Sequence, residues 1–312
     1  MSDEPKLIVG LGELLWDLLP GGKQLGGAPA NFAVMSARLG NRGIIASRVG
    51  RDALGDEALA YLATLPADLS YLQSDNEHAT GSVSITLRDG QAEYVFHQPV
   101  AWDFLTATPE WLDLAANADA VCFGTLAQRH SVSHETIQLF LKATRENCVR
   151  VFDVNLRKPF YDAQSLGISL KHATLLKLNE PEMPIVMSLL GFAQHSGVDE
   201  SSLITSASLL LDHFPLKLVC VTMGSQGSLL VTRETHHRHH GIATAVADTV
   251  GAGDAFTAAL VSFYLKDAPL AVLNEAGNRW GSWVASQRGA MPALPPDTRD
   301  LIDAQILRAA VQ

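Results

Sequence analysis

Short apolar runs alternate with amphipathic segments along most of this chain. The apolar runs have the length of buried strands, and the amphipathic segments repeat their apolar residues every three or four positions, as helices do. Strands are predicted at 6–15, 43–50, 119–124, 149–154, 174–179 and 217–224, a further strand pair at 227–232 and 241–247, and helices at 29–39, 54–65, 133–146, 181–190, 201–213, 252–265 and 270–286. This alternation indicates an α/β fold with a mostly parallel central sheet, helices on both faces, and ligands at the carboxyl ends of the strands.

The segment at 81–96 follows a different pattern. Two alternating runs flank Asp89 and Gly90, a pair that favours the tight turn of a β-hairpin. Such a hairpin beside a parallel sheet can serve as a lid. Because no segment has the composition of a linker, residues 1–312 are predicted to form a single domain, with a small β lid at about 81–104 inserted within it.

Composition narrows the classes of function. The formal net charge is −10, and a nucleic-acid binder would show a basic face, so DNA or RNA is not expected as a partner. The first residues lack the basic and apolar regions of a signal peptide, and no apolar run is long enough to cross a bilayer, so no membrane partner is expected. The three cysteines, Cys122, Cys148 and Cys220, are scattered, which predicts free thiols and a reducing, cytoplasmic compartment.

The stretch DTVGAGDAFTAAL, at 248–260, carries the strongest candidate chemistry. A good helix follows its glycines, so the N–H groups of Gly251, Ala252 and Gly253 would point out of the helix N-terminus and form an anion hole. Asp254, in the first turn, could accept a hydroxyl proton while that hole holds a phosphoryl group. The four residues Gly-Ala-Gly-Asp alone would more often be a turn followed by a helix-start carboxylate.

Several motifs in a fixed order make the chain resemble the ribokinase-like (PfkB) carbohydrate kinases, and fructokinases most closely among them. The first signature of that family resembles GGAPANFAVMSARLG at 26–40 with its continuation at 47–56, and the second resembles 248–260. The resemblance covers nearly the entire chain. It implies a three-layer ribokinase-like fold and transfer of phosphate from ATP to a primary hydroxyl of a small sugar, with Asp254 as the base and Mg²⁺ as cofactor.

The resemblance also implies sugar contacts near the N-terminus. Gly26, Gly27 and Asn31 align with positions that contact the sugar, although GGAPAN alone would more often cap a helix. Asp17, directly after the first predicted strand, aligns with an aspartate of the family that binds the substrate. A carboxylate there can accept hydrogen bonds from two hydroxyl groups, and the alternative is an aspartate of a surface turn.

DVNLRKPFY, at 153–161, resembles the D-x-N-x-R stretch of fructokinases and 2-keto-3-deoxygluconate kinases. Arg157 carries a fork of donors suited to phosphate or substrate oxygens, unless it serves in a structural ion pair. Asp153 and Asn155 are expected to line the same opening of the binding site as Arg157.

Nucleotide and metal contacts follow from two further motifs. Asn179 and Glu182 have the N-x-x-E spacing that organises Mg²⁺ and its waters in the family, and Asn179 could equally cap the next helix. Thr222, Gly224 and Gly227 resemble the T-x-G-x-x-G loop that lies against ATP, although such a loop alone is no more than a hairpin turn.

Other features carry less weight. A contact of Asn278 with adenine and a K⁺ site near Asp248 rest on the resemblance alone. The histidine run at 236–240 is predicted to be a solvated surface stretch, because adjacent residues of an extended segment point to opposite faces and cannot share a metal. Trp102, after the hairpin, could touch the sugar.

Two departures from the family pattern bear on assembly and substrate. Only LLPGGKQL separates Asp17 from Gly26, which predicts a lid reduced to the 81–96 hairpin, argues against lid-mediated dimerisation, and leaves a monomer or a homodimer open. His97 and Gln98 stand where keto-acid kinases of the family often place an arginine for the substrate carboxylate. The absence of that arginine favours a neutral sugar as the substrate, and fructose is the first candidate.

Competing interpretations stay open. A 2-keto-3-deoxygluconate kinase, or a ribose or nucleoside kinase, would share this scaffold. A non-catalytic sugar-binding regulator is opposed by the intact Asp254 and its flanking glycines. An NAD-dependent dehydrogenase is opposed by the missing third glycine after Gly10-x-Gly12.

Overall fold

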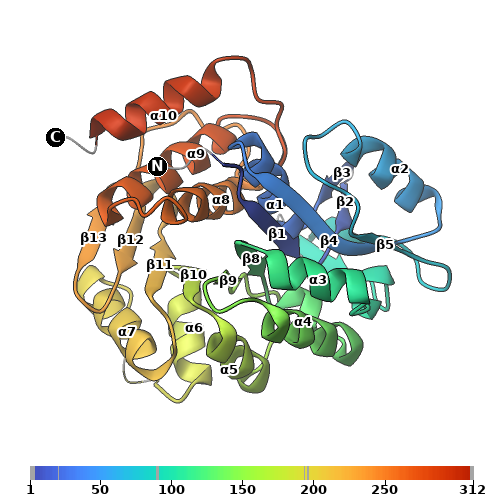
Figure 1. Cartoon of the computed structure of the whole chain (residues 1–312), viewed down its shortest axis with the longest axis horizontal. Helices are drawn as coiled ribbons and strands as arrows, with labels where there is room; N and C mark the ends of the chain where they lie inside the picture. Colours follow the sequence, from blue (N-terminus) through green and yellow to red (C-terminus); the bar gives the residue numbers. More distant parts are fainter. Residues whose placement is uncertain (1–3, 20, 89–90, 193, 195–196, 310–312) are drawn as a thin grey trace.

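A nine-stranded sheet forms the centre of the molecule in the computed structural model, which describes residues 4–19, 21–88, 91–192, 194 and 197–309 (Figure 1). The strands from β11 to β5 are parallel, and β12 and β13 are antiparallel additions at one edge. The α/β prediction with a mostly parallel sheet is therefore confirmed. In spatial order the strands are β13 (His236–His239), β12 (Ser228–Val231), β11 (Leu218–Thr222), β10 (Leu175–Asn179), β9 (Val149–Asp153), β8 (Ala120–Phe123), β1 (Leu7–Leu11), β4 (Arg42–Gly50) and β5 (Leu72–Asp75).

Helices cover both faces of this sheet (Figure 1). One face carries α1 (Ala28–Arg38), α8 (Ala252–Tyr264), α9 (Leu270–Ala285) and α10 (Thr298–Ala309), with α2 (Ala53–Leu62) packed beside β4. The other face carries α3 (Pro109–Asn117), α4 (Ser131–Ala143), α5 (Ala163–His172), α6 (Glu182–Leu189) and α7 (Glu200–His213). All the predicted helices are present, whereas α3, α5 and α10 were not predicted.

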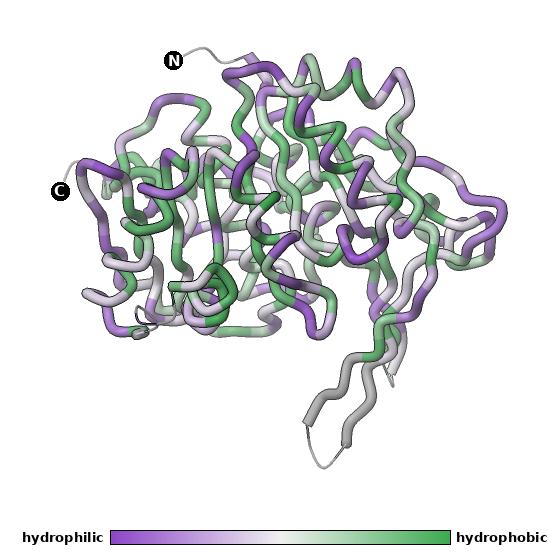
Figure 2. The backbone as a smooth tube through the Cα atoms, turned by 90° about the horizontal axis from the view of Figure 1, so that it is seen from below, coloured by the Kyte–Doolittle hydropathy of each residue, from purple (hydrophilic) through white to green (hydrophobic). Residues whose placement is uncertain are grey.

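The strands read as continuous apolar runs because both faces of the sheet are buried. In β8, Val121 and Phe123 face the core under α4 and α5, whereas Ala120 and Cys122 face the core under α8 and α9. Hydrophobic segments accordingly run through the body of the molecule, and hydrophilic residues lie mostly at its outer turns (Figure 2). The same alternation determines which polar side chains of the strands point toward α8.

A second, four-stranded sheet stands apart from the large one. Its spatial order is β3 (Gly22–Gly26), β2 (Leu15–Leu19), β6 (Gly81–Arg88) and β7 (Gln91–Phe96). The hairpin was predicted, and its turn at Asp89 and Gly90 lies outside the described residues. The prediction that the lid consists of this hairpin alone was wrong, because β2 and β3 extend the same sheet. Ala101–Phe104, which the predicted lid included, forms a short 3₁₀ helix instead.

The last strand of the large sheet also differs from its prediction. The chain turns back at once after β12, where the Thr232 N–H donates to the Thr235 carbonyl at 2.8 Å, so the partner strand is His236–His239 and not 241–247. Its histidines are not a purely solvated stretch, since His239 Nε2 lies 2.8 Å from Glu275 Oε2 of α9. Within the described ranges, no three His, Cys, Asp or Glu residues are grouped to hold a metal ion.

The three cysteines are free and buried, as predicted. No helix among the described residues is both long and apolar enough to cross a membrane.

Candidate active site

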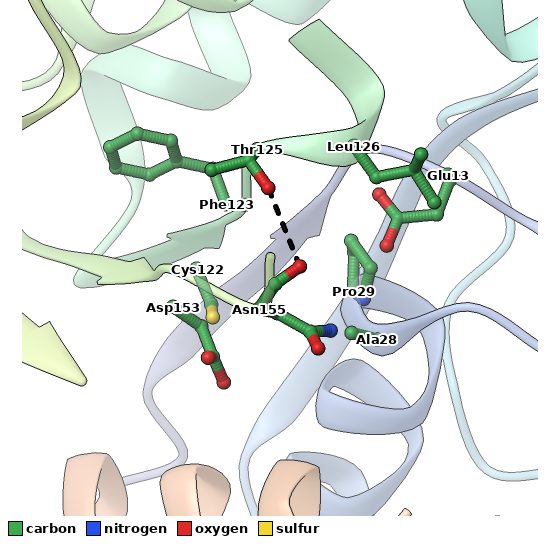
Figure 3. A pocket seen from close by; sticks show the side chains of 10 residues that line it. Glu13, Ala28, Pro29, Cys122, Phe123, Thr125, Leu126, Asp153 and Asn155 are labelled. Carbon is green, nitrogen blue, oxygen red and sulfur yellow. Dashed lines mark hydrogen bonds between the residues drawn. The ribbon is translucent and has the colours of Figure 1, made fainter. Parts of the chain in front are cut away.

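The strand order marks where a ligand should bind. The chain adds β4 and β5 on one side of β1, and then β8 to β11 on the other side. Such a reversal opens a crevice at the carboxyl ends of the strands. A small cavity lies there, at the ends of β1, β8 and β9 (Figure 3). Its lining residues are Glu13, Ala28, Pro29, Cys122, Phe123, Gly124, Thr125, Leu126, Asp153 and Asn155.

Asp254 lies in the first turn of α8, as the sequence predicts. Gly251 caps this helix at φ 79°, and a Cβ there would approach the Ala290 backbone to 2.7 Å, so the turn requires glycine. The Ala252 N–H donates to the Thr249 carbonyl at 3.3 Å and is therefore partly engaged. Within the part of the chain that the structure describes, the N–H groups of Gly253 and Asp254 find no backbone acceptor, as expected in a first helical turn. They can receive an anion beside the Asp254 carboxylate.

Asn31 of α1 holds that carboxylate in place. Its Nδ2 donates a hydrogen bond of 2.7 Å to Asp254 Oδ2, and its own Oδ1 is buried without a partner among the residues that the structure describes. Burial and the charge of Asp153 raise the pKa of Asp254 to about 6, against the opposing effect of the Asn31 hydrogen bond. Asp254 nevertheless keeps part of its surface accessible. A carboxylate with this pKa can accept a proton at neutral pH.

Asp17 reaches the site from the second sheet. It lies within β2, between Gln24 of β3 and Val83 of β6, and does not directly follow the first strand as the sequence suggested. Burial raises the pKa of Asp17, and the charge of Arg157 opposes that effect. Asp17 and Arg157 are 140 residues apart in the chain, and the fold brings them close enough for their charges to interact.

Arg157 stands exposed on the loop after β9. Its Nη1 donates to the carbonyl of Leu156 at 3.1 Å, and no described carboxylate lies within ion-pair distance of it. The structural ion pair that was the alternative is therefore not formed. The positive charge of the guanidinium opposes the raised pKa values of Glu13, Asp17 and Asp254, so it acts on all three groups.

Glu13 is a residue of this site that the motifs did not reveal. It follows β1 and is only 4% exposed, and within the described part of the chain its Oε2 is buried without a hydrogen-bond partner. Burial raises the pKa of Glu13 to about 7, and the nearby Asp254 adds to the effect. The signal in the sequence was a carboxylate standing inside the apolar run GLGELL.

Lys177 was also missed. It lies on β10, and its Nζ is 3.1 Å from the carboxylate of Asp153 on β9. Asp153, proposed as a substrate contact, is 4% exposed and is also contacted by Thr257 Oγ1 at 3.4 Å. Asn155 lines the cavity with φ 40°, and its carbonyl accepts a bond from Thr125 Oγ1 (Figure 3). A lysine inside the apolar run LLKLN was the available signal.

The glycine pair before α1 has a structural reason of its own. Gly27 caps the helix at φ 115°, and a Cβ there would lie 2.4 Å from the Glu13 carbonyl oxygen. A Cβ on Gly26 would lie 3.4 Å from Asp17 Oδ2. The glycines therefore bring Asp17 and Glu13 close to α1, and contact with sugar stays a prediction.

Asn179 and Glu182 cap the end of β10 reciprocally. Asn179 Oδ1 accepts from the Glu182 N–H, and Glu182 Oε2 accepts from the Asn179 N–H, both at 2.9 Å. Glu182 Oε1 accepts from the Leu156 N–H at 2.7 Å, and burial raises the pKa of Glu182. Because their oxygens already accept these bonds, the pair fits Mg²⁺ held through water rather than by direct coordination.

The loop that the sequence predicts to lie against the nucleotide is next to this pair. Asn179 and Thr222 are register partners at the ends of β10 and β11. Gly224 has φ 54° and is open on its Cβ side, whereas a Cβ on Gly227 would lie 2.1 Å from the His239 carbonyl oxygen. The loop is thus pinned to β13 at Gly227 and free at Gly224.

Two predicted contacts have other partners in the structure. Asn278 is 7% exposed, and its Nδ2 donates to Ser228 Oγ at 2.7 Å and to the Asn274 carbonyl at 2.8 Å. Asp248 accepts from the N–H groups of Val250 and Gly289 at 3.0 and 3.1 Å, and so ties two loops together. Contact of Asn278 with adenine and a K⁺ site near Asp248 stay predictions.

Trp102 does not belong to the site. It is 1% exposed, and Arg129 stacks on its ring at 3.9 Å. Arg129 in turn pairs with both carboxylate oxygens of Asp103 at 2.7 and 2.8 Å. A contact between Trp102 and sugar is therefore excluded by its burial.

The fold and the carboxylate at the start of α8 define a class, the kinases that transfer phosphate to a small hydroxyl compound. Comparison with known proteins makes this specific. The profile of the pfkB family carbohydrate kinases matches residues 20–297, so the chain belongs to that family. It is an ATP-dependent sugar kinase.

Three relatives illustrate the similarity. A probable fructokinase-3 of Arabidopsis thaliana is 27% identical over 96% of this chain and 92% of its own length. An uncharacterized sugar kinase from Pyrococcus horikoshii, solved in complex with ATP, is 28% identical, with a TM-score of 0.79 over 97% of this chain and 99% of that one. A fructokinase from Vibrio cholerae O395, solved with fructose, ADP and calcium ion bound, shares the fold, with a TM-score of 0.80 at 24% identity over 96% of this chain and 99% of that one.

Proposed function

We propose that this sugar kinase is a fructokinase that phosphorylates a primary hydroxyl, with Asp254 as the general base. The observation that carries the proposal is a partly accessible carboxylate, held by Asn31, beside unpaired N–H groups at the start of α8. Asp254 takes the proton of the sugar hydroxyl, whose oxygen bonds to the γ-phosphorus of ATP while the bond to the ADP oxygen breaks.

The supporting groups are distributed along the strand ends. The N–H groups of Gly253 and Asp254 and the exposed Arg157 stabilise charge on the transferring phosphoryl group. ATP extends toward Thr222, Gly224 and Gly227. Asn179 and Glu182 would hold Mg²⁺ through water, and the ion would neutralise phosphate charge.

The second sheet is proposed to cover the sugar, because it supplies Asp17. Asn31 and Gly27 form the opposite wall, at the start of α1, and Gly26 contributes from β3 of the second sheet itself. Whether the sheet also joins two molecules stays open between a monomer and a homodimer. The free cysteines support a reducing compartment, and we infer the cytoplasm.

The charges around the cavity favour a neutral sugar over a keto acid. The carboxyl groups of Glu13 and Asp153 line it, and those of Asp17 and Asp254 are close enough to the exposed Arg157 for its charge to act on them. The other nearby arginine, Arg129, is neutralised by Asp103. Both ring nitrogens of His97 contact serine hydroxyls of the second sheet, at 2.8 and 3.0 Å. An anionic substrate would meet mostly like charge.

The test is ADP release with Mg-ATP and fructose, ribose, 2-keto-3-deoxygluconate or adenosine. We expect fructose to give the highest kcat/KM, and Asp254→Asn to lose about 10²–10⁴-fold of it while still binding ATP. Asp212→Asn, an exposed position on α7, is the matched control and should retain full activity. Highest turnover of another compound would reassign the substrate, and an active Asp254→Asn would remove the base assignment.

A further inference from the structure

A buried lysine lies beneath the start of α8. Lys177 is 8% exposed, although lysine is rarely buried unless it is paired. Its register partner on the neighbouring parallel strand is Asp153, so the two side chains leave the sheet on the same face. The Nζ is 3.1 Å from both Asp153 oxygens. This is an ion pair built into the centre of the sheet.

The ion pair touches α8 directly. A Cβ built on Gly253 would lie 3.3 Å from Lys177 Nζ, so the ammonium group lies against the first helical turn. Thr257, one turn later, contacts Asp153 Oδ2 at 3.4 Å and donates to the Gly253 carbonyl at 2.9 Å. A cation beneath a helix N-terminus is unfavourable by itself, because that end already carries positive partial charge. The arrangement therefore needs the carboxylates around it.

Those carboxylates include the proposed base. Lys177 is paired directly, since its Nζ lies 3.1 Å from each carboxylate oxygen of Asp153. From the side of Asp254, Asp153 on β9 raises its pKa, whereas Lys177 on β10 lowers it.

Four other groups that act on Asp254 come from elsewhere in the fold. They are Asn31 of α1, Arg157 on the loop after β9, Glu13 after β1, and the buried thiol of Cys122 on β8.

We propose that Lys177 and Asp153 are positioning residues for Asp254, a buried ion pair that supports the first turn of α8 and acts on the base with two opposite charges. The inference rests on the proposed role of Asp254. Neither residue needs to touch the sugar. Removing one of the two charges should shift the pH above which Asp254 is deprotonated and can accept a proton. The direction of that shift should depend on which charge is removed.

The experiment compares the acid limb of the pH profile of kcat/KM in Lys177→Met and Asp153→Asn. Loss of the lysine charge should move the limb to higher pH, and loss of the aspartate charge should move it to lower pH, each by about half a unit or more. Lys171→Met, exposed on α5, and Asp212→Asn are the matched controls and should leave the limb in place. A merely structural pair would lower activity equally at every pH.

Each single variant leaves a buried charge without its partner, which can prevent folding. The double variant Lys177→Met with Asp153→Asn avoids this. Its limb should move to lower pH, because Asp153 acts on Asp254 more strongly than Lys177 does. Unmoved limbs, or shifts of both single variants in the same direction, would overturn the inference. An active Asp254→Asn would instead overturn the proposed base, so the two failures can be told apart.

Discussion

At the scale of single residues, the site gathers acidic groups where little water reaches them. Burial raises the pKa of Glu13 to about 7 and that of Asp254 to about 6, because it penalises the charged form. Asn31 opposes this at Asp254 by donating a hydrogen bond to the carboxylate. The protonation state of the site therefore depends on a few contacts that can be removed one at a time.

The first such contact is the hydrogen bond from Asn31. Asn31→Leu keeps a similar volume but removes the donor, so the pKa of Asp254 should rise above about 6. Since the base must be deprotonated, the acid limb of kcat/KM should move to higher pH, which a pH profile measures. Asn117→Leu on the surface of α3 is the control. A limb that stays at the wild-type pH would show that the hydrogen bond does not govern the base.

The second feature that can be removed is the buried carboxyl group of Glu13. Its pKa is raised on folding from 4.5 to about 7, so its contribution to stability is present below pH 4.5 and is lost as pH rises through about 7. Glu13→Gln has no charge to bury and should raise Tm by about 3 °C or more at pH 8, with little change at pH 4.

Thermal melts at both pH values check this expectation. Glu135→Gln, at an exposed position of α4, should show no such pH dependence. An equal effect of Glu13→Gln at pH 4 and pH 8 would indicate a packing effect instead of a buried charge.

At the scale of elements, two turns that are proposed to face the ligands depend on glycines packed against neighbouring backbone. Gly251 begins α8 against Ala290, and Gly227 closes the loop after β11 against β13. Both have positive φ, where other residues are strained. A turn of this kind is set jointly by its own sequence and by the element beside it.

The glycines of the nucleotide loop allow a matched comparison. Gly224→Ala meets open space and should cost about 1–2 kcal/mol of stability from its positive φ alone. Gly227→Ala must in addition move β13, because its Cβ would lie 2.1 Å from the His239 carbonyl oxygen. We expect a clearly larger loss of Tm and a higher KM for ATP in Gly227→Ala. Equal losses in the two variants would contradict the pinning of the loop at β13.

At the scale of the whole molecule, both faces of the sheet are sealed by helices, and the cysteines lie inside. Cys122, Cys148 and Cys220 are at most 4% exposed, and burial raises the pKa of each thiol, to about 11 for Cys148. A thiol reacts as its thiolate, so both protection and protonation slow the reaction.

The native protein should therefore react very slowly with a chromogenic disulfide reagent. All three thiols should react once denaturant unfolds the chain. Reductant should leave Tm unchanged, because no disulfide is present. Rapid reaction of one thiol in native buffer would reveal local opening of the sheet or of its helices.

Residues in contiguous motifs could be assigned from the sequence, whereas isolated residues could not. Asp254, Gly251 and Asn31 could be singled out because their motifs are contiguous, and the structure brings Asp254 and Asn31 within hydrogen-bond distance. Glu13 and Lys177 could not be assigned, because each stands alone in an apolar run and acquires its role from residues on other elements. The second sheet was underestimated because β2 and β3 are too short to show a clear alternation.

The sequence by itself determined the α/β class, the helices α1, α2, α4 and α6 to α9, and the turn that begins α8. These depend on local periodicity, on glycine conformation and on helix ends, which neighbouring residues encode. Only the tertiary structure decided that Asp17 comes from a second sheet, that β13 is the histidine strand, and that Lys177 pairs with Asp153 beneath Asp254. Those outcomes depend on which strands lie side by side and on how deeply a charge is buried, and both are set by contacts between residues far apart in the chain.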